Sequence, residues 1–224
     1  MSSSFHPTPR TLMGPGPSDV HPRVLGAMAK ATIGHLDPEF IALMEDIKDL
    51  LRYTFRTENK LTLPLSAPGS AAMEASFANL VEVGDKVIVC INGVFGMRMA
   101  ENVRRMNGEL VTVEDEWGTQ VDPEKVEAAL KANPDAKILA FVHAETSTGV
   151  RSDAQTLCAL AEQYGCLSIV DSVTGLAGIE LEVDAWKADV TYSGTQKCLS
   201  APPGISLITF SDKAAAQVKA RNTP

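Results

Sequence analysis

The stretch Asp189-Val190-Thr191-Tyr192-Ser193-Gly194-Thr195-Gln196-Lys197-Cys198 begins as an apolar run typical of a β-strand and ends in small residues that present one lysine. Upstream, Ser168-Ile169-Val170-Asp171-Ser172 is a second apolar run, and it ends at an aspartate. If the two runs are parallel strands of one sheet, the aspartate and the lysine lie at the same edge. Ligands of open α/β sheets bind in the crevice outside that edge.

The chain around these two runs alternates between short apolar segments and helical segments separated by turn residues. Such alternation predicts right-handed βαβ crossovers and a sheet that is covered by helices on both faces. We therefore predict an α/β fold with a mostly parallel sheet of about seven strands between helices. The predicted strands are 61–65, 86–91, 110–113, 138–142, 167–170, 190–193 and 205–210, and the helices between them are 71–80, 95–106, 123–132 and 154–164.

The N-terminal segment, residues 1–20, is rich in proline and glycine, with Gly14-Pro15-Gly16-Pro17-Ser18 at its centre. This composition excludes a regular helix or an interior strand. We expect an extended arm over a partner subunit or over the mouth of a pocket; the alternative is a disordered tail. Helical spacing predicts helices at 22–31 and 38–51. The domain prediction is an arm at 1–20 and one large α/β domain at 21–224.

Composition places the chain among soluble globular proteins: it has 224 residues, 45% of them hydrophobic, and a net charge of −8. An acidic surface gives no reason to expect nucleic acid or a membrane as a partner. The four cysteines form no CxxC pair, so we expect reduced thiols and no metal site. With no signal peptide or membrane span, a cytoplasmic location is expected; peroxisome and mitochondrion stay as alternatives in a eukaryote.

An anion site is predicted at Ser66-Ala67-Pro68-Gly69-Ser70-Ala71-Ala72-Met73-Glu74, which follows a strand and opens a helix. Small residues let the backbone approach a phosphate closely, and the free N–H groups of a first helical turn favour it. Gly69 and Ser70 are the predicted donors. The alternative is an ordinary βα turn, and the pattern is neither GxGxxG nor GxxxxGK[ST], which disfavours a dinucleotide or nucleoside triphosphate.

Two further strand ends carry candidate ligand contacts. Phe95 follows strand 86–91 and could stack on a planar ring, although such a residue more often packs at the start of a helix. Thr146, in the polar loop after strand 138–142, is the preferred hydroxyl contact, with a capping loop as the alternative. His143 in the same loop could stack or carry a proton, but a structural role is favoured.

Pyridoxal phosphate (PLP) suits an amine and a carboxylate placed in this way. Lys197 would form the Schiff base and carry a proton, and Asp171 would pair with the pyridinium nitrogen, a partner that offsets the cost of burying its charge. Val173 would pack against the ring, and Gln196 could form a hydrogen bond with its phenolic oxygen. For Asp171 the alternative is a helix cap, and for Lys197 a surface lysine, which leaves Ser193, Gly194 and Thr195 unexplained.

The motifs together resemble those of class V aminotransferases, in particular the alanine-glyoxylate and serine-pyruvate (serine-glyoxylate) group. The likeness is co-linear from Gly14 to the end of the chain. It is carried by Gly14 to Ser18, Ser66 to Glu74, Glu145-Thr146-Ser147-Thr148-Gly149, Val170-Asp171-Ser172-Val173, Ser193 to Lys197 and Ala201-Pro202-Pro203-Gly204.

This resemblance implies the large domain of a PLP-dependent transferase of fold type I, with PLP on Lys197 and Asp171 at its ring nitrogen. It implies Gln196 and Thr146 near the phenolic oxygen, and Gly69 and Ser70 at the phosphate. Phe95 would stack on the ring where many relatives carry tryptophan, and Ser70 stands where some have histidine. A homodimer with shared active sites is implied, as is transfer of an amino group from alanine or serine to glyoxylate or a similar 2-oxo acid.

The resemblance also leaves two alternatives open. The segments Asp37-Pro38-Glu39-Phe40 and Glu116-Trp117-Gly118-Thr119 are similar to those of (S)-ureidoglycine-glyoxylate transaminases. Relatives continue into a C-terminal domain that carries the arginine for the substrate carboxylate, and we expect that domain to be absent from this chain, which ends at Pro224. The second alternative is therefore a truncated, non-catalytic PLP-binding or dimerisation fragment.

Overall fold

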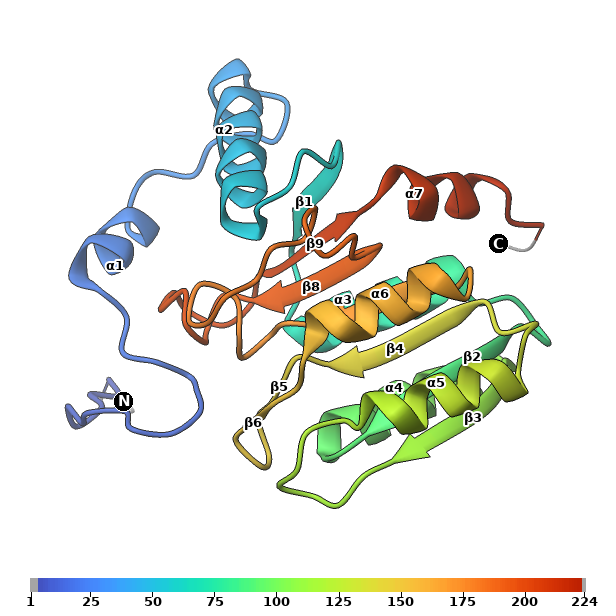
Figure 1. The fold of residues 1–224 in the computed structure, drawn as a ribbon. Coiled ribbons are helices and arrows are strands. Elements are labelled where there is room, and N and C mark those ends of the chain that lie inside the picture. Colours follow the sequence, from blue (N-terminus) through green and yellow to red (C-terminus); the bar gives the residue numbers. More distant parts are fainter. Residues whose placement is uncertain (1–3, 223–224) are drawn as a thin grey trace.

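The computed structural model describes residues 4–222 and contains a seven-stranded sheet of order β1-β9-β8-β7-β4-β2-β3. Only β9 runs against its neighbours, β1 and β8; the pairs from β8 to β3 are all parallel (Figure 1). The predicted mostly parallel α/β sheet is thus confirmed. The strands are β1 (Leu61–Leu65), β2 (Lys86–Ile91), β3 (Glu109–Glu114), β4 (Ile138–Val142), β7 (Leu167–Asp171), β8 (Val190–Gly194) and β9 (Ser206–Phe210).

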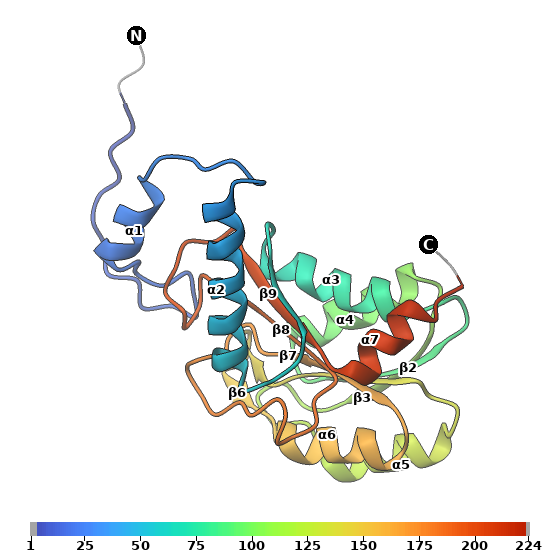
Figure 2. The same ribbon diagram turned by 90° about the horizontal axis from the view of Figure 1, so that it is seen from above.

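Helices cover both faces of this sheet, as Figure 2 shows. One face packs against α3 (Gly69–Leu80), α4 (Val94–Arg105) and α7 (Asp212–Lys219). The opposite face packs against α5 (Pro123–Ala132), α6 (Ala154–Gln163) and the C-terminal end of α2 (Pro38–Phe55). Strands β4, β7, β8 and β9 are buried along their whole length because both faces of the sheet are covered. Alternate side chains enter the two layers; for example, Val89 of β2 lies in the first and Cys90 in the second.

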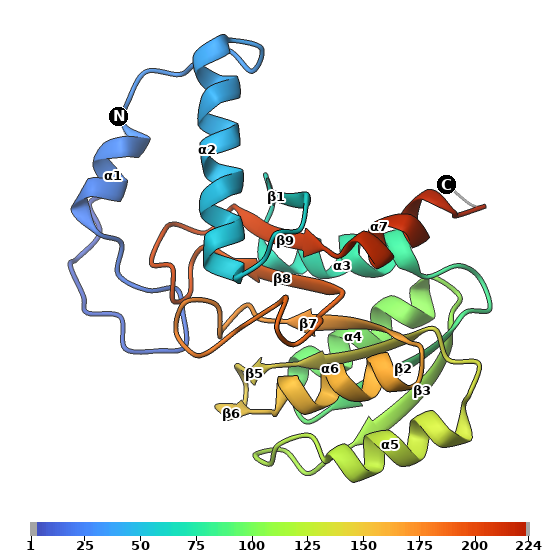
Figure 3. The same cartoon turned by 45° about the horizontal axis from the view of Figure 1, so that its top comes forward.

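Helix α1 (Pro22–Met28) differs from the other helices because it stands away from the sheet (Figure 3). It has no buried residue and ends before Ala31, the predicted end. Helix α2 begins where Asp37 caps it and Pro38 occupies the first turn, as predicted, and it continues to Phe55. Residues 4–20 contain no helix or strand; residues 1–3 and 223–224 of the predicted arm and domain lie outside the described residues.

The structure adds three short elements to the prediction. The loop after β4 contains a small hairpin, β5 (Ala144–Glu145) and β6 (Val150–Arg151), whose strands are too short to show an alternating pattern. Helix α7 follows β9, capped by the side chain of Ser211. No helix among residues 4–222 is long and apolar enough to cross a membrane.

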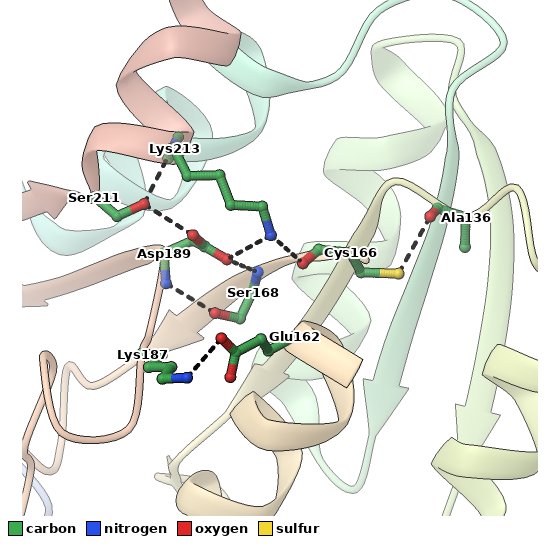
Figure 4. A network of polar contacts seen from close by, with 9 residues as sticks. Ala136, Glu162, Cys166, Ser168, Lys187, Asp189, Ser211 and Lys213 are labelled. Carbon is green, nitrogen blue, oxygen red and sulfur yellow. Dashed lines mark hydrogen bonds and ion pairs between the residues drawn. The ribbon is translucent and has the colours of Figure 1, made fainter. Parts of the chain in front are cut away.

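The amino-terminal edge of strands β7 and β8 is tied together by Asp189 (Figure 4). Its carboxylate accepts hydrogen bonds from the Ser168 backbone N–H at 3.0 Å and from the Ser211 hydroxyl at 2.8 Å. The Lys213 Nζ lies 3.7 Å from the same carboxylate and donates to the Cys166 carbonyl oxygen at 2.9 Å. This network joins two strands and α7 into one unit.

Candidate active site

The carboxyl-terminal edge of the parallel strands carries a cavity of about 160 Å³. Asp171 is the last residue of β7 and pairs in register with Tyr192 of β8. The chain leaves β8 at Gly194 and reaches Gln196 and Lys197 within three residues. The predicted site residues, apart from Thr146, all line this one cavity, which is formed by Pro68, Gly69, Ser70, Met73, Phe95, Arg98, Asp171, Val173, Gln196 and Lys197.

Asp171 is buried, with 2% of its surface exposed, and its carboxylate has two neutral donors. The Val173 backbone N–H and the Tyr192 hydroxyl each donate to it at 2.9 Å. Burial raises the pKa of Asp171 to about 6, although both hydrogen bonds act to lower it. A cationic group that entered the cavity beside this carboxyl would stabilise its charged form.

Tyr192 is a site residue that sequence reasoning missed, because it was taken as part of an apolar strand. Its side chain is fully buried, and burial, with Asp171 beside it, raises the pKa of its hydroxyl well above the ordinary range. The hydroxyl therefore remains a donor to the carboxylate. The available signal was the strand register: if 167–171 and 190–194 pair in parallel, Tyr192 lies beside Asp171.

Lys197 is held by a tight turn that follows β8. The Thr195 hydroxyl donates to the carbonyl oxygens of Pro202 at 2.7 Å and of Ile205 at 3.0 Å. The Ser200 backbone N–H donates to the Lys197 carbonyl oxygen at 2.9 Å. Among residues 4–222, no acid forms a salt bridge with the Lys197 amine, whose hydrogen bond goes instead to the Pro15 carbonyl oxygen at 2.9 Å.

The N-terminal arm lies across this turn and contacts Lys197, one of the residues that line the cavity. The backbone N–H of Ser18 donates to the Gln196 carbonyl oxygen at 2.9 Å, and the Ser18 hydroxyl donates to that of Lys197 at 2.7 Å. Gly16 has a φ of +121°, and a Cβ atom added there would lie 2.3 Å from Lys197 Cδ. A pocket mouth was one of the positions predicted for the arm, and the glycine permits its close approach.

The predicted anion cup is the first turn of α3. Gly69 begins the helix, and Pro68 in the N-cap position provides no side-chain hydrogen bond. The first backbone N–H groups of such a helix have no partner within the helix, so they can bind an anion. A Cβ atom added at Gly69 would lie 3.2 Å from Val173 Cγ2, which shows how closely α3 packs against the end of β7.

Phe95 lies in the first turn of α4 and is partly buried against the sheet. The guanidinium carbon of Arg98 lies 4.8 Å from the centre of its ring. Arg98 lines the cavity as well, and the sequence interpretation did not include it. The i, i+3 spacing on a predicted helix was the signal that would have found it.

The loop after β4 holds the two remaining candidates. The Thr146 hydroxyl shares a hydrogen bond with the Thr174 hydroxyl and does not line the cavity, so its contact with a ligand stays a prediction. His143 is buried, packs edge-on against Trp186 with ring centres 5.6 Å apart, and does not line the cavity. Burial lowers its pKa to about 4, which agrees with the favoured structural role.

Comparison with known proteins identifies the family. A family model described as aminotransferase class-V matches residues 13–222. The chain belongs to the class V aminotransferases. It is 42% identical over 214 residues to alanine-glyoxylate aminotransferase of Rattus norvegicus. The aligned region covers 96% of this chain and 51% of that protein. It is 38% identical over 212 residues to the (S)-ureidoglycine-glyoxylate transaminase of Bacillus subtilis, with 95% and 51% covered.

Solved structures of class V aminotransferases show the same fold. The crystal structure of an alanine-glyoxylate aminotransferase from Nostoc sp. superposes with a TM-score of 0.97 and 43% identity, over 100% of this chain and 59% of that one. The chain thus spans about half the length of the curated relatives it matches.

Membership of the class V aminotransferase family implies PLP as the cofactor, and the cavity fits it in three respects. The buried Asp171 carboxylate has room for a cationic neighbour. The Oε1 atom of Gln196 is buried without a hydrogen-bond partner in the described part of the chain. The uncapped first turn of α3 and the Lys197 amine border the same space.

Proposed function

We propose that the chain is the PLP-binding part of a transaminase that moves an amino group from a small amino acid, alanine or serine, to glyoxylate or a similar 2-oxo acid. The observation that carries the proposal is the meeting of the Lys197 amine, the Asp171 carboxylate and the uncapped start of α3 in one cavity. Relatives whose names state this activity cover 96% of the chain, which supports the choice of substrates.

Each side chain has a distinct part in this proposal. When bound, PLP supplies an electron sink that makes the Cα–H bond of an amino acid easier to break. Lys197 would be the covalent attachment point, and the amino group of the substrate would displace its amine. The freed Lys197 amine would then carry a proton from the substrate Cα to C4′ of the cofactor. Asp171 keeps the ring nitrogen protonated, and the Tyr192 hydroxyl holds this carboxylate in place.

Other residues bind and orient the group. Gly69 and Ser70 would bind its phosphate with the N–H groups of the first turn of α3, while Phe95 and Val173 would enclose its ring. Gln196 and Thr146 are the proposed contacts of the phenolic oxygen. The arm residues Pro15 to Ser18 would limit the access of water to the lysine, because they lie across the turn that carries it.

The half-reaction with an amino donor tests this proposal. The chain is loaded with PLP, alanine or serine is added, and the visible absorbance of the bound cofactor is followed. A shift to the spectrum of pyridoxamine phosphate, and its reversal by glyoxylate, is expected. Lys197→Ala is the control that should show neither change. A loaded chain whose spectrum no donor alters would fit the alternative of a non-catalytic PLP-binding fragment.

A second candidate function is (S)-ureidoglycine-glyoxylate transamination. It is favoured by 38% identity to the Bacillus subtilis enzyme and by a TM-score of 0.96 to the crystal structure of the same type of enzyme from that species. The same spectral titration, with ureidoglycine in place of alanine or serine, separates the two. The donor with the highest rate of the half-reaction at equal concentration identifies the function.

We also propose a homodimer and a cytoplasmic location; peroxisome and mitochondrion remain the alternatives. Large apolar side chains are exposed on the N-terminal helices, including Leu25 and Met28 of α1 and Leu50 of α2, which supports a partner surface there. All four cysteines are free, which supports a reducing compartment. Analytical ultracentrifugation tests the dimer, and cell fractionation tests the location.

A further inference from the structure

We propose that Glu145 is a positioning residue for the cofactor site: it fixes the first turn of α4 from outside the helix and thereby sets the place of the Phe95 ring. The inference rests on the proposed PLP site. It concerns a carboxylate that is buried, with 1% of its surface exposed, and that does not line the cavity itself.

The first turn of α4 has no cap of its own, because the residue in the N-cap position is Gly93. The hairpin loop of β5 and β6 supplies the missing acceptors. The Phe95 backbone N–H donates to Glu145 Oε2 at 3.1 Å, and the Val94 backbone N–H donates to the Ser147 hydroxyl at 3.0 Å. Two N–H groups that would otherwise lack a partner are therefore satisfied by a segment about 50 residues away in the chain.

Glu145 also arranges the loop that carries it. Its Oε1 atom accepts hydrogen bonds from the Ser147 backbone N–H at 3.0 Å and from the Ser147 hydroxyl at 2.7 Å. Thr146, the proposed hydroxyl contact of the cofactor, lies between these two residues. One carboxylate thus holds both the residue predicted to stack on the ring and the loop predicted to reach its phenolic oxygen.

The loop that carries Glu145 and Ser147 packs closely against the start of α4. A Cβ atom added at Gly93 would lie 2.3 Å from Glu145 Cγ and 2.6 Å from Ser147 Oγ. No Lys or Arg among residues 4–222 forms a salt bridge with Glu145, so the N–H groups and the positive end of the helix compensate its charge. Any shorter side chain at 145 would free the first turn of α4 and, with it, Phe95 and the Arg98 that stacks on it.

The test is a double-mutant cycle on the PLP affinity of the full chain. Glu145→Ala should weaken PLP binding about tenfold, because hydrogen bonds to a buried charged group are strong. Glu145→Gln keeps one acceptor oxygen and should lose about threefold. In a Phe95→Ala background, Glu145→Ala should change the affinity by less than about twofold, because the ring that it positions is gone.

Asp122→Ala serves as a matched control, and amide hydrogen exchange provides a measurement that does not need the cofactor. Asp122 caps α5, accepting a hydrogen bond from the Glu124 backbone N–H at 2.9 Å, and Asp122→Ala should leave PLP affinity unchanged. Amide hydrogen exchange at Phe95 should be faster in Glu145→Ala. Parent-like affinity in Glu145→Ala, or an equal loss with and without Phe95, would overturn this inference alone. A parent chain that binds no PLP would contradict the proposed function and overturn the inference with it.

Discussion

Asp171 at the end of β7 and Asp189 immediately before β8 are both buried carboxylates, but they lie at opposite edges of the sheet. Asp189, 7% exposed, has a backbone donor, a hydroxyl donor and an ammonium group 3.7 Å away. Asp171, 2% exposed, has two neutral donors and no cation within salt-bridge distance among residues 4–222. The first is satisfied within the protein, whereas the second is left with a pKa of about 6.

The difference separates a structural carboxylate from one prepared for a ligand. A hollow alone does not do so, because Asp189 also lines one, of about 330 Å³. The nearby lysines differ in the same sense: Lys213 pairs with Asp189, while the Lys197 amine donates to the Pro15 carbonyl oxygen and forms no salt bridge among residues 4–222. At the carboxyl-terminal edge, the Asp171 carboxylate and the Lys197 amine therefore have neutral partners, and a bound ligand could supply a charged one.

The largest effect is expected at the structural edge. Asp189→Ala should lower the free energy of unfolding by about 4 kcal/mol, because it leaves the Ser168 N–H and the Ser211 hydroxyl without their acceptor. Urea denaturation measures this loss. Glu162→Ala, which breaks only the exposed pair with Lys187 nearby, is the control and should cost less than about 1 kcal/mol. A loss of that smaller size for Asp189→Ala would contradict the structural role.

The stability of the folded chain should fall as the pH rises through the pKa of Asp171. Its pKa in the folded chain is raised, so the folded state retains a proton that the unfolded state loses. The contribution is fully present below the ordinary pKa of 3.8 and is lost as the pH rises through about 6. At about 1.4 kcal/mol per pKa unit, the loss is about 3 kcal/mol.

Denaturation of the cofactor-free chain at several pH values, with Asp171→Asn as the reference, measures the contribution of Asp171 to the free energy of unfolding. The parent should lose stability relative to the variant between pH values of about 4 and 6. A difference that stays constant over that range would mean that Asp171 is already ionised and satisfied, like Asp189.

For cofactor affinity, substitution of Asp171 should have a larger effect than substitution of Asp189, the reverse of their order for stability. Asp171→Asn should weaken PLP binding about 100-fold, because the substitution removes one partner of a buried charge pair. Asp189→Asn, at a temperature where it stays folded, should change the affinity by less than about threefold. Equilibrium dialysis measures both. Equal losses in the two variants would show that the aspartates act only through the stability of the sheet.

The smallest effect is expected in the arm. Gly16→Ala would place a methyl group against the Lys197 side chain and strain a backbone with a φ of +121°, so it should destabilise the seated arm by about 1 kcal/mol. Limited proteolysis should then cut residues 4–20 faster. Gly14→Ala is the matched control, because nothing lies within 4 Å of its added Cβ. Equal cleavage in the two variants would argue against a seated arm.

Much of this comparison could be predicted from the chain alone. Continuous apolar runs predict the strands, and the polar residues that follow two of these runs include Asp171, Gln196 and Lys197. The strand ends predict such a cluster because parallel strands bring their carboxyl ends to one edge. Gly69 and Phe95 followed from the same rule, applied to the strands before α3 and α4.

The missed features depend on which strands are neighbours and in what register. The Tyr192 hydroxyl reaches Asp171 only because β7 and β8 pair with those residues side by side. Glu145 reaches the start of α4 only because the β4 strand lies next to β2. Local periodicity does not reveal either contact. Arg98 lies one turn beyond Phe95 on α4 and borders the same cavity.

Reductive trapping of the cofactor tests the central claim most directly. The chain is incubated with PLP, treated with borohydride, digested, and its peptides are identified by mass spectrometry. We expect a pyridoxyl group on Lys197 and none on Lys213, the lysine paired with Asp189 at the opposite edge. Labelling spread over surface lysines, or an unmodified Lys197, would contradict it.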